Sequence, residues 1–116
     1  MNDDWFLNSV DEVQRAADDL HAALDLTMDA LAEARAAHLA GSDIVEVVRG
    51  LADRGGRETR LAPTRAFHAY EQALTAYRAR AIRALVDERH MTYTAIAELT
   101  GVSRQMVARL YRAGLT

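Results

Sequence analysis

Apolar residues recur at helical spacing along most of this chain. The longest run is near the N-terminus, where intervals of three and four residues alternate over more than three heptads. This pattern predicts one long amphipathic helix with a coiled-coil-like seam. Ser9 and Glu12 fit a capping box at its start, and Gly41 fits its end. The seam positions are Val10, Val13, Ala17, Leu20, Leu24, Thr27, Leu31 and Ala34.

A helix of this length would extend about 45 Å. Such a helix cannot bury its whole seam inside one small subunit, so the seam predicts pairing with a second copy of the chain. We expect the dimer interface to include Val13, Leu20, Leu24 and Leu31.

A second long helix is predicted from Pro63 to Arg89, because proline suits a first helical turn. Its length nearly matches the first helix, so the two are expected to form an antiparallel hairpin. Arg80 and Arg83 fall away from its apolar stripe and are expected to remain available for phosphate. The stripe consists of Phe67, Tyr70, Leu74, Tyr77, Ala81 or Ile82, and Leu85.

A short helix is predicted between the two long ones. Asp43 can cap it, and Ile44, Val45, Val48 and Leu51 supply its apolar face. Adjacent glycines at 55 and 56 predict that it ends in a flexible loop over residues 53–60.

The region of residues 92–102 has the pattern of a short capped helix followed by a tight turn. Thr92 can cap the helix, and Ile96, Ala97 and Leu99 are predicted to form its inward face. Gly101 falls at its end, where a left-handed backbone is easily adopted by glycine.

A second short helix follows. Val102 is expected to anchor the turn, Ser103 to cap the helix, and Val107 and Leu110 to pack beneath it. Four polar residues, Arg104, Gln105, Arg109 and Arg112, are left facing outward.

The stretch YTAIAELTGVSRQMVARLYR resembles the helix-turn-helix of bacterial regulators, resolvase-type DNA-binding domains and region 4 of sigma factors. The resemblance covers residues 93–112 and the helix before them. It implies a three-helix unit whose last helix, residues 103–113, lies in a DNA major groove. Base contacts are then expected from Arg104, Gln105 and Arg109, since arginine and glutamine suit guanine and adenine edges. Phosphate contacts are expected from Thr92, Thr94, Ser103 and Arg112. The alternative is a helical hairpin with no DNA contact.

Charge is divided along the chain, although the formal net charge is only -3. Residues 1–40 contain nine acidic residues and two arginines, for a net charge of -7. Residues 77–116 contain seven arginines and three acidic residues, for a net charge of +4. The positive part carries the motif, which favours attraction of that end to a phosphate backbone.

Few residues suggest other chemistry. Cysteine is absent, which excludes disulfides and thiolate sites. The serines fall at predicted helix starts, and His21 with Asp25 is a weak metal pair on an acidic face. We therefore expect no enzyme, metal or cofactor. The N-terminal residues form neither a signal peptide nor a membrane anchor, so a cytoplasmic (nucleoid) location is expected.

Together these patterns predict an all-α protein with a hairpin of two long helices and a C-terminal helix-turn-helix unit. Residues 1–62 would form a helical dimerisation or interaction region, and residues 63–116 the long helix leading into the DNA-binding unit. The favoured interpretation is a small homodimeric transcriptional regulator that binds specific double-stranded DNA. Two alternatives remain: an adaptor that docks on a partner such as RNA polymerase or a sigma factor, and a nucleoid-associated protein of low specificity.

An internal repeat is a further possibility. A shift of 51 residues places Gly50 over Gly101 and Val45 over Ile96, so residues 43–60 could be a decayed second copy of the motif. Coincidence between two amphipathic helices is the simpler explanation.

Overall fold

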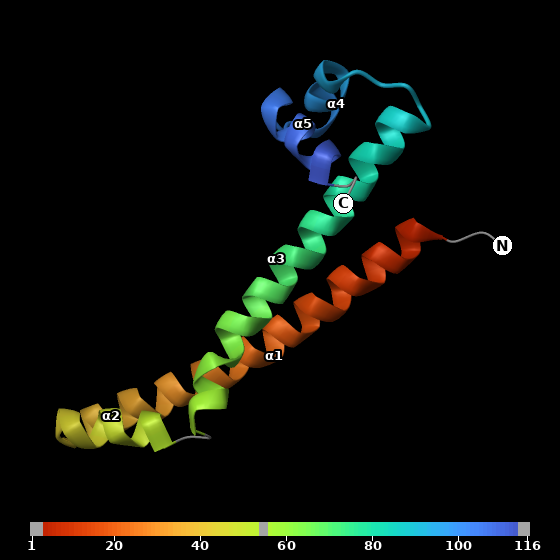
Figure 1. Ribbon diagram of the computed structural model, residues 1–116. Helices are drawn as coiled ribbons and strands as arrows, with labels where there is room; N and C mark the ends of the chain where they lie inside the picture. The colour runs from red at the N-terminus through yellow and green to blue at the C-terminus, as the bar shows by residue number, and fades with distance from the viewer. Residues whose placement is uncertain (1–3, 54–55, 114–116) are drawn as a thin grey trace. The chain divides into compact units, whose positions relative to one another are not determined.

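The computed structural model describes residues 4–53 and 56–113, and the regular structure in those ranges is α-helical (Figure 1). The helices are α1 (Trp5–Leu39), α2 (Ile44–Asp53), α3 (Gly56–Asp87), α4 (Tyr93–Thr100) and α5 (Arg104–Ala113). The predicted all-α class, with a long N-terminal and a long central helix, is confirmed. The chain forms two compact units, residues 4–14 with 71–113 and residues 15–70, which are described separately below. The expected division at residue 62 stays a prediction.

The start of α1 lies earlier than the sequence predicts. Asp4 caps the helix, because its Oδ1 accepts a hydrogen bond from the Leu7 N–H at 3.1 Å. The proposed capping box at Ser9 is therefore wrong, and Ser9 lies within the helix. Aromatic contacts hold this first turn against α3: the Phe6 and Tyr77 ring centroids are 6.0 Å apart.

The end of α1 follows the prediction. Gly41 adopts a left-handed backbone with φ 92°. The Gly41 N–H donates to the His38 carbonyl and the Ser42 N–H donates to the Ala37 carbonyl, both at 3.0 Å. This is a Schellman motif, which satisfies carbonyls that the helix leaves unpaired.

Small residues face inward along α1 in the unit of residues 15–70. Ala23 is buried, while Leu24 and Leu31 are exposed. A cavity of about 160 Å³ separates α1 from α2, lined by Ala30, Glu33, Ala34, Ala37, Glu46, Val47, Gly50 and Leu51. Of the expected interface residues, Val13 and Leu20 are half-buried within the chain. The inward-facing residues thus include the seam position Ala34 and three alanines beside the seam, Ala23, Ala30 and Ala37, because small side chains let helices approach closely.

Helix α2 begins at the predicted cap, where the Asp43 Oδ2 accepts from the Val45 N–H at 3.1 Å. Its apolar residues Ile44, Val45 and Val48 are nevertheless exposed. Gly50 lies inside this helix, whereas Gly101 ends one. Gly50 therefore does not form the turn that Gly101 forms, and coincidence between two amphipathic helices stays the simpler explanation.

The loop predicted over residues 53–60 is largely helical. Helix α3 begins at Gly56, so Pro63 is inside it and not in its first turn. Residues 54 and 55 lie outside the described residues. A proline inside a helix lacks the N–H that would donate to the carbonyl four residues before. The sequence rule placed the helix start at Pro63 because proline is best tolerated there.

Candidate nucleic-acid interface

The C-terminal helices pack on the end of α3 around four buried side chains. These are Ile82 of α3, Ile96 of α4, and Val107 and Leu110 of α5, with Ile96 and Val107 fully buried. Half-buried residues surround them, including Ala97 and Val102. The inward positions predicted for Ile96, Val107 and Leu110 are confirmed. This cluster fixes the orientation of α5 relative to α4.

Leu99 is not part of this core, contrary to the prediction. Its side chain is 65% exposed. The inward face of α4 is formed by Tyr93, Ile96 and Ala97, which pack against the buried cluster. At about 100° per residue, Leu99 lies roughly a third of a turn away from the centre of that face. The sequence analysis did not identify Tyr93 as part of this face, and only the packing shows it there.

The starts of α4 and α5 are held by side-chain caps and the turn between them by a glycine, as predicted. The Thr92 Oγ1 accepts from the Ala95 N–H, and the Ser103 Oγ accepts from the Met106 N–H, both at 3.1 Å. Gly101 has φ 77°, and its N–H donates to the Ala97 carbonyl at 2.9 Å. Val102 then packs against the cluster. These bonds fix where α5 begins, and hence which of its residues face solvent.

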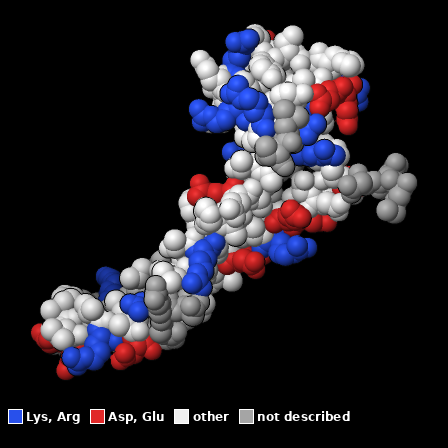
Figure 2. All heavy atoms as spheres, in the orientation of Figure 1, with Lys and Arg blue, Asp and Glu red and all other residues white. Residues whose placement is uncertain are grey.

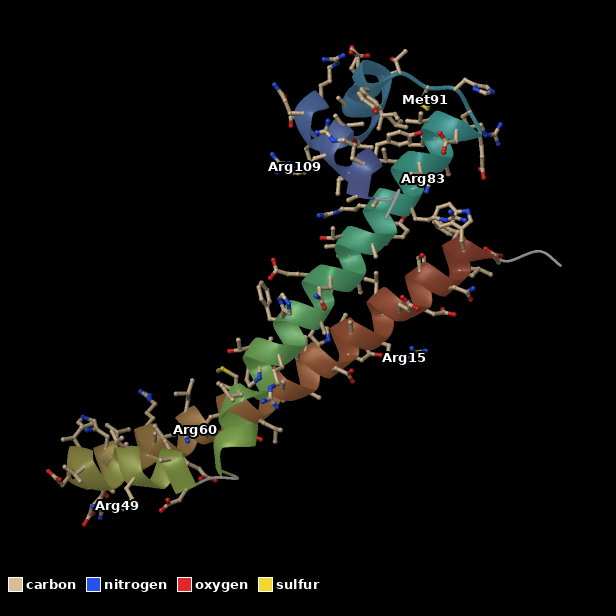
Figure 3. The ribbon with its side chains drawn as sticks, viewed as in Figure 1. Arg15, Arg49, Arg60, Arg83, Met91 and Arg109 are labelled. Atoms are coloured by element: carbon tan, nitrogen blue, oxygen red, sulfur yellow. The ribbon has the colours of Figure 1, made fainter. Side chains whose placement is uncertain are left out.

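The polar residues of α5 are exposed. Gln105, Arg109 and Arg112 follow one another at intervals of four and three residues, on the face opposite Val107. Arg104 is also exposed but lies at the flank, about 60° round the helix from Val107. Figure 3 shows Arg109 on the outer side of α5. In Figure 2 basic side chains gather over the C-terminal helices, and α5 itself carries no acidic residue.

The expected phosphate contacts lie at the starts of the two short helices. Thr92, Thr94 and Ser103 are exposed there. Thr92 and Ser103 also cap their helices, so their hydroxyl oxygens already accept backbone hydrogen bonds. Arg112 is exposed in the last turn of α5. Exposed N–H groups and hydroxyls at helix starts suit an anion.

Tyr111 is an anchor of α5 that the sequence analysis missed. Its hydroxyl donates to the Asp87 carboxylate of α3 at 2.8 Å, and its ring centroid lies 5.9 Å from that of Tyr93. The hydrogen bond to Asp87, together with partial removal from water, raises the pKa of Tyr111 above its ordinary value of 10.0. The sequence did contain a signal for this role: Tyr111 lies four residues after Val107, which places it on the same inward face of the helix.

Arg83 and Arg80 do not both face solvent as predicted. The Arg83 side chain projects from α3 (Figure 3). Its guanidinium lies 3.5 Å from the Asp87 carboxylate one turn along the helix, and the side chain is only 29% exposed. The prediction for Arg83 is therefore wrong, because packing of α5 against α3 encloses that face. Arg80 is exposed, with its guanidinium 5.3 Å from the Trp5 ring centroid.

The connection from α3 to α4 contains a strained residue. His90 has φ 56°, a left-handed conformation that is uncommon for a residue with a Cβ. The His90 N–H donates to the Val86 carbonyl and the Met91 N–H to the Leu85 carbonyl, both at 3.0 Å. Met91 packs between α3 and α4 against the buried cluster (Figure 3). The bend thus brings Thr92 to the start of α4.

No group of three or more potential metal-ligating side chains occurs among the described residues. None of the helices in residues 4–53 and 56–113 is long and apolar enough to cross a membrane.

Comparison with known proteins gives no family for this chain: no protein-family model, curated protein or solved structure matches it. A functional interpretation therefore depends on the geometry of α4 and α5 and on the chemistry of their exposed residues.

Proposed function

We propose that the chain is a sequence-specific double-stranded DNA-binding protein, a small homodimeric transcriptional regulator with α5 in the major groove. The observation that carries the proposal is the exposed polar face of α5, presented by a helix pair with a glycine turn and a capped second helix. This is the arrangement expected of a helix-turn-helix unit.

The chemistry of the exposed face supports DNA over other anionic partners. A guanidinium can donate two hydrogen bonds to guanine, and a glutamine amide can pair with adenine. Gln105 and Arg109 share the outward face of α5, and Arg104 lies at its first turn. These three residues are proposed to read bases.

Residues at the edges of this face are proposed to contact the DNA backbone. They are Thr92, Thr94 and Ser103 at the helix starts and Arg112 at the end of α5. Such contacts orient a protein on the duplex without distinguishing sequences. Loss of one should weaken binding to all duplexes alike.

The interaction-protein alternative has one observation in its favour. The apolar residues Ile44, Val45 and Val48 of α2 are exposed, and an exposed apolar patch marks an interaction site. Binding to random duplex DNA separates the two functions, because DNA binding should weaken steeply with salt and a pure adaptor should show no such binding.

The direct test is to substitute α5 residues and titrate the variants against a duplex selected from a random pool. Arg104→Ala, Gln105→Ala and Arg109→Ala should each cost about 1–3 kcal/mol of specific binding, concentrated at one or two base pairs. Arg49→Ala in α2 is the matched control and should bind as the parent does. Circular dichroism should show that all four remain helical. Parent-like affinity of all three α5 variants for the selected site would exclude base reading by α5.

A further inference from the structure

The unit of residues 15–70 exposes several large apolar side chains. They come from two helices and define what we call the α1–α2 apolar face: Leu24, Met28 and Leu31 of α1 with Ile44, Val45 and Val48 of α2. All six are exposed and lie within one unit. Together they present an apolar area on the order of several hundred Å², the size that marks an interaction site.

The two helices present these residues on the same side. Helix α2 folds back along α1 (Figure 1). Val47 and Leu51 line the cavity between the two helices together with Ala30, Ala34 and Ala37. On each helix, the exposed apolar residues are rotated about the helix axis by roughly a third of a turn from the residues that line the cavity. The rotation has the same sense on both helices when each is followed from its N-terminus to its C-terminus. Because the helices run in opposite directions, equal rotations carry both sets to the same side of the pair. The exposed residues therefore form one continuous face.

The charges beside this face are arranged to complement themselves. Asp25 lies next to Leu24, and Arg35 lies one turn beyond Leu31; both are exposed. In an antiparallel contact between two α1 helices centred near residue 30, residue 25 of one copy lies opposite residue 35 of the other. The contact then forms two Asp25–Arg35 pairs and places Met28 beside Leu31 at the centre. A two-fold contact requires such a self-complementary surface.

We propose that the α1–α2 apolar face binds the same face of a second copy of this chain, with the two α1 helices antiparallel. The interface differs from the seam that the sequence predicts: it includes α2 and omits Val13, which belongs to the other unit. This inference rests on the proposed function in one respect: the proposed regulator is a homodimer, because a two-fold dimer presents two α5 helices to one DNA site.

The experiment measures dimer dissociation of the full chain by sedimentation and light scattering at micromolar concentration. Leu31→Glu should raise the dimer Kd about 30-fold or more, as expected for a charge at the centre of an interface. Leu26→Glu is the matched control. Leu26 lies on the opposite side of α1 and is exposed to a similar degree, 54% against 51% for Leu31. A monomeric parent protein, or equal weakening by both variants, would overturn the proposal.

Charge exchange tests the orientation and keeps the proposal testable should Leu31→Glu fail to fold. Asp25→Arg and Arg35→Asp should each weaken the dimer about tenfold, because each places like charges opposite one another. The double variant should restore parental affinity. If neither Leu31→Glu nor Asp25→Arg weakens the dimer, this face is not the interface.

Failure of the inference and failure of the proposed function give different results. A dimer that responds to these substitutions but binds no duplex retains the interface and loses the DNA-binding function. A monomer whose binding to duplex depends on Gln105 and Arg109 overturns the interface alone. Capture of a different protein by a monomeric chain would overturn the second-copy pairing.

Discussion

At the scale of single residues, backbone conformation decides what each glycine contributes. Gly101 has φ 77° at the end of α4, whereas Gly50 lies inside α2. A Cβ added at either position meets no atom within 4 Å. The two sites therefore differ in backbone conformation and not in available space, which makes them a matched pair.

Replacement of these glycines by alanine should change stability in opposite directions. Gly101→Ala should lower the free energy of unfolding by about 1–2 kcal/mol, because a Cβ is disfavoured in the left-handed region. Gly50→Ala should raise it by about 0.5–1 kcal/mol, since alanine has the better helix propensity. Urea unfolding monitored by circular dichroism measures both. A neutral Gly101→Ala would show that the α4–α5 turn does not require the left-handed backbone.

At the scale of elements, the starts of the helices explain both the successes and the errors of the sequence rules. Asp43, Thr92 and Ser103 cap α2, α4 and α5 as predicted, because each side chain reaches a backbone N–H within three residues. The starts of α1 and α3 were misplaced, since several residues near each of them are compatible with a helix start. In α3 the helix continues upstream through Pro63.

Pro63→Ala provides a test of where α3 begins. If the helix starts at Gly56, alanine restores a backbone hydrogen bond and removes a steric clash, and stability should rise by about 1–3 kcal/mol. Thermal unfolding of Pro63→Ala against Thr64→Ala, an exposed neighbour whose change should be small, measures the difference. Loss of stability in Pro63→Ala would instead place the proline in a first turn, where it is favourable.

At the scale of the whole molecule, charge is segregated along the chain. The C-terminal residues 77–116 carry +4 and residues 1–40 carry -7. Under the proposed function, DNA binding should therefore depend on the arginines of the C-terminal unit even though the protein is acidic as a whole. The net charge alone would have argued against a nucleic-acid partner.

The salt dependence of duplex binding tests this division. Arg112→Ala should reduce the slope of log Kd against log salt by about one charge and weaken binding to selected and random duplexes alike. Arg49→Ala removes the same charge from α2 in the other unit and should leave the slope unchanged. Fluorescence anisotropy at several salt concentrations gives both slopes. Equal slopes for the parent and Arg112→Ala would remove Arg112 from the phosphate contacts.

Local signals in the sequence determined the helical class, the caps of three helices, the glycine-ended turns and the buried side of α5. They also identified the exposed polar residues of α5 as candidates, because caps, glycine turns and helical periodicity are set by residues a few positions apart. The roles of Arg104, Gln105, Arg109 and Arg112 stay predictions.

Contacts between distant residues were decided only by the tertiary structure. Tyr111 reaches Asp87, Tyr93 packs against the buried cluster while Leu99 does not, and Arg83 is enclosed near α5. Periodicity shows which residues share a helix face but not which neighbour that face meets. Helix α1 shows the same limit of periodicity. Its pattern indicated an apolar face, but the alanines of α1 face inward within the chain, and Leu24 and Leu31 are left exposed.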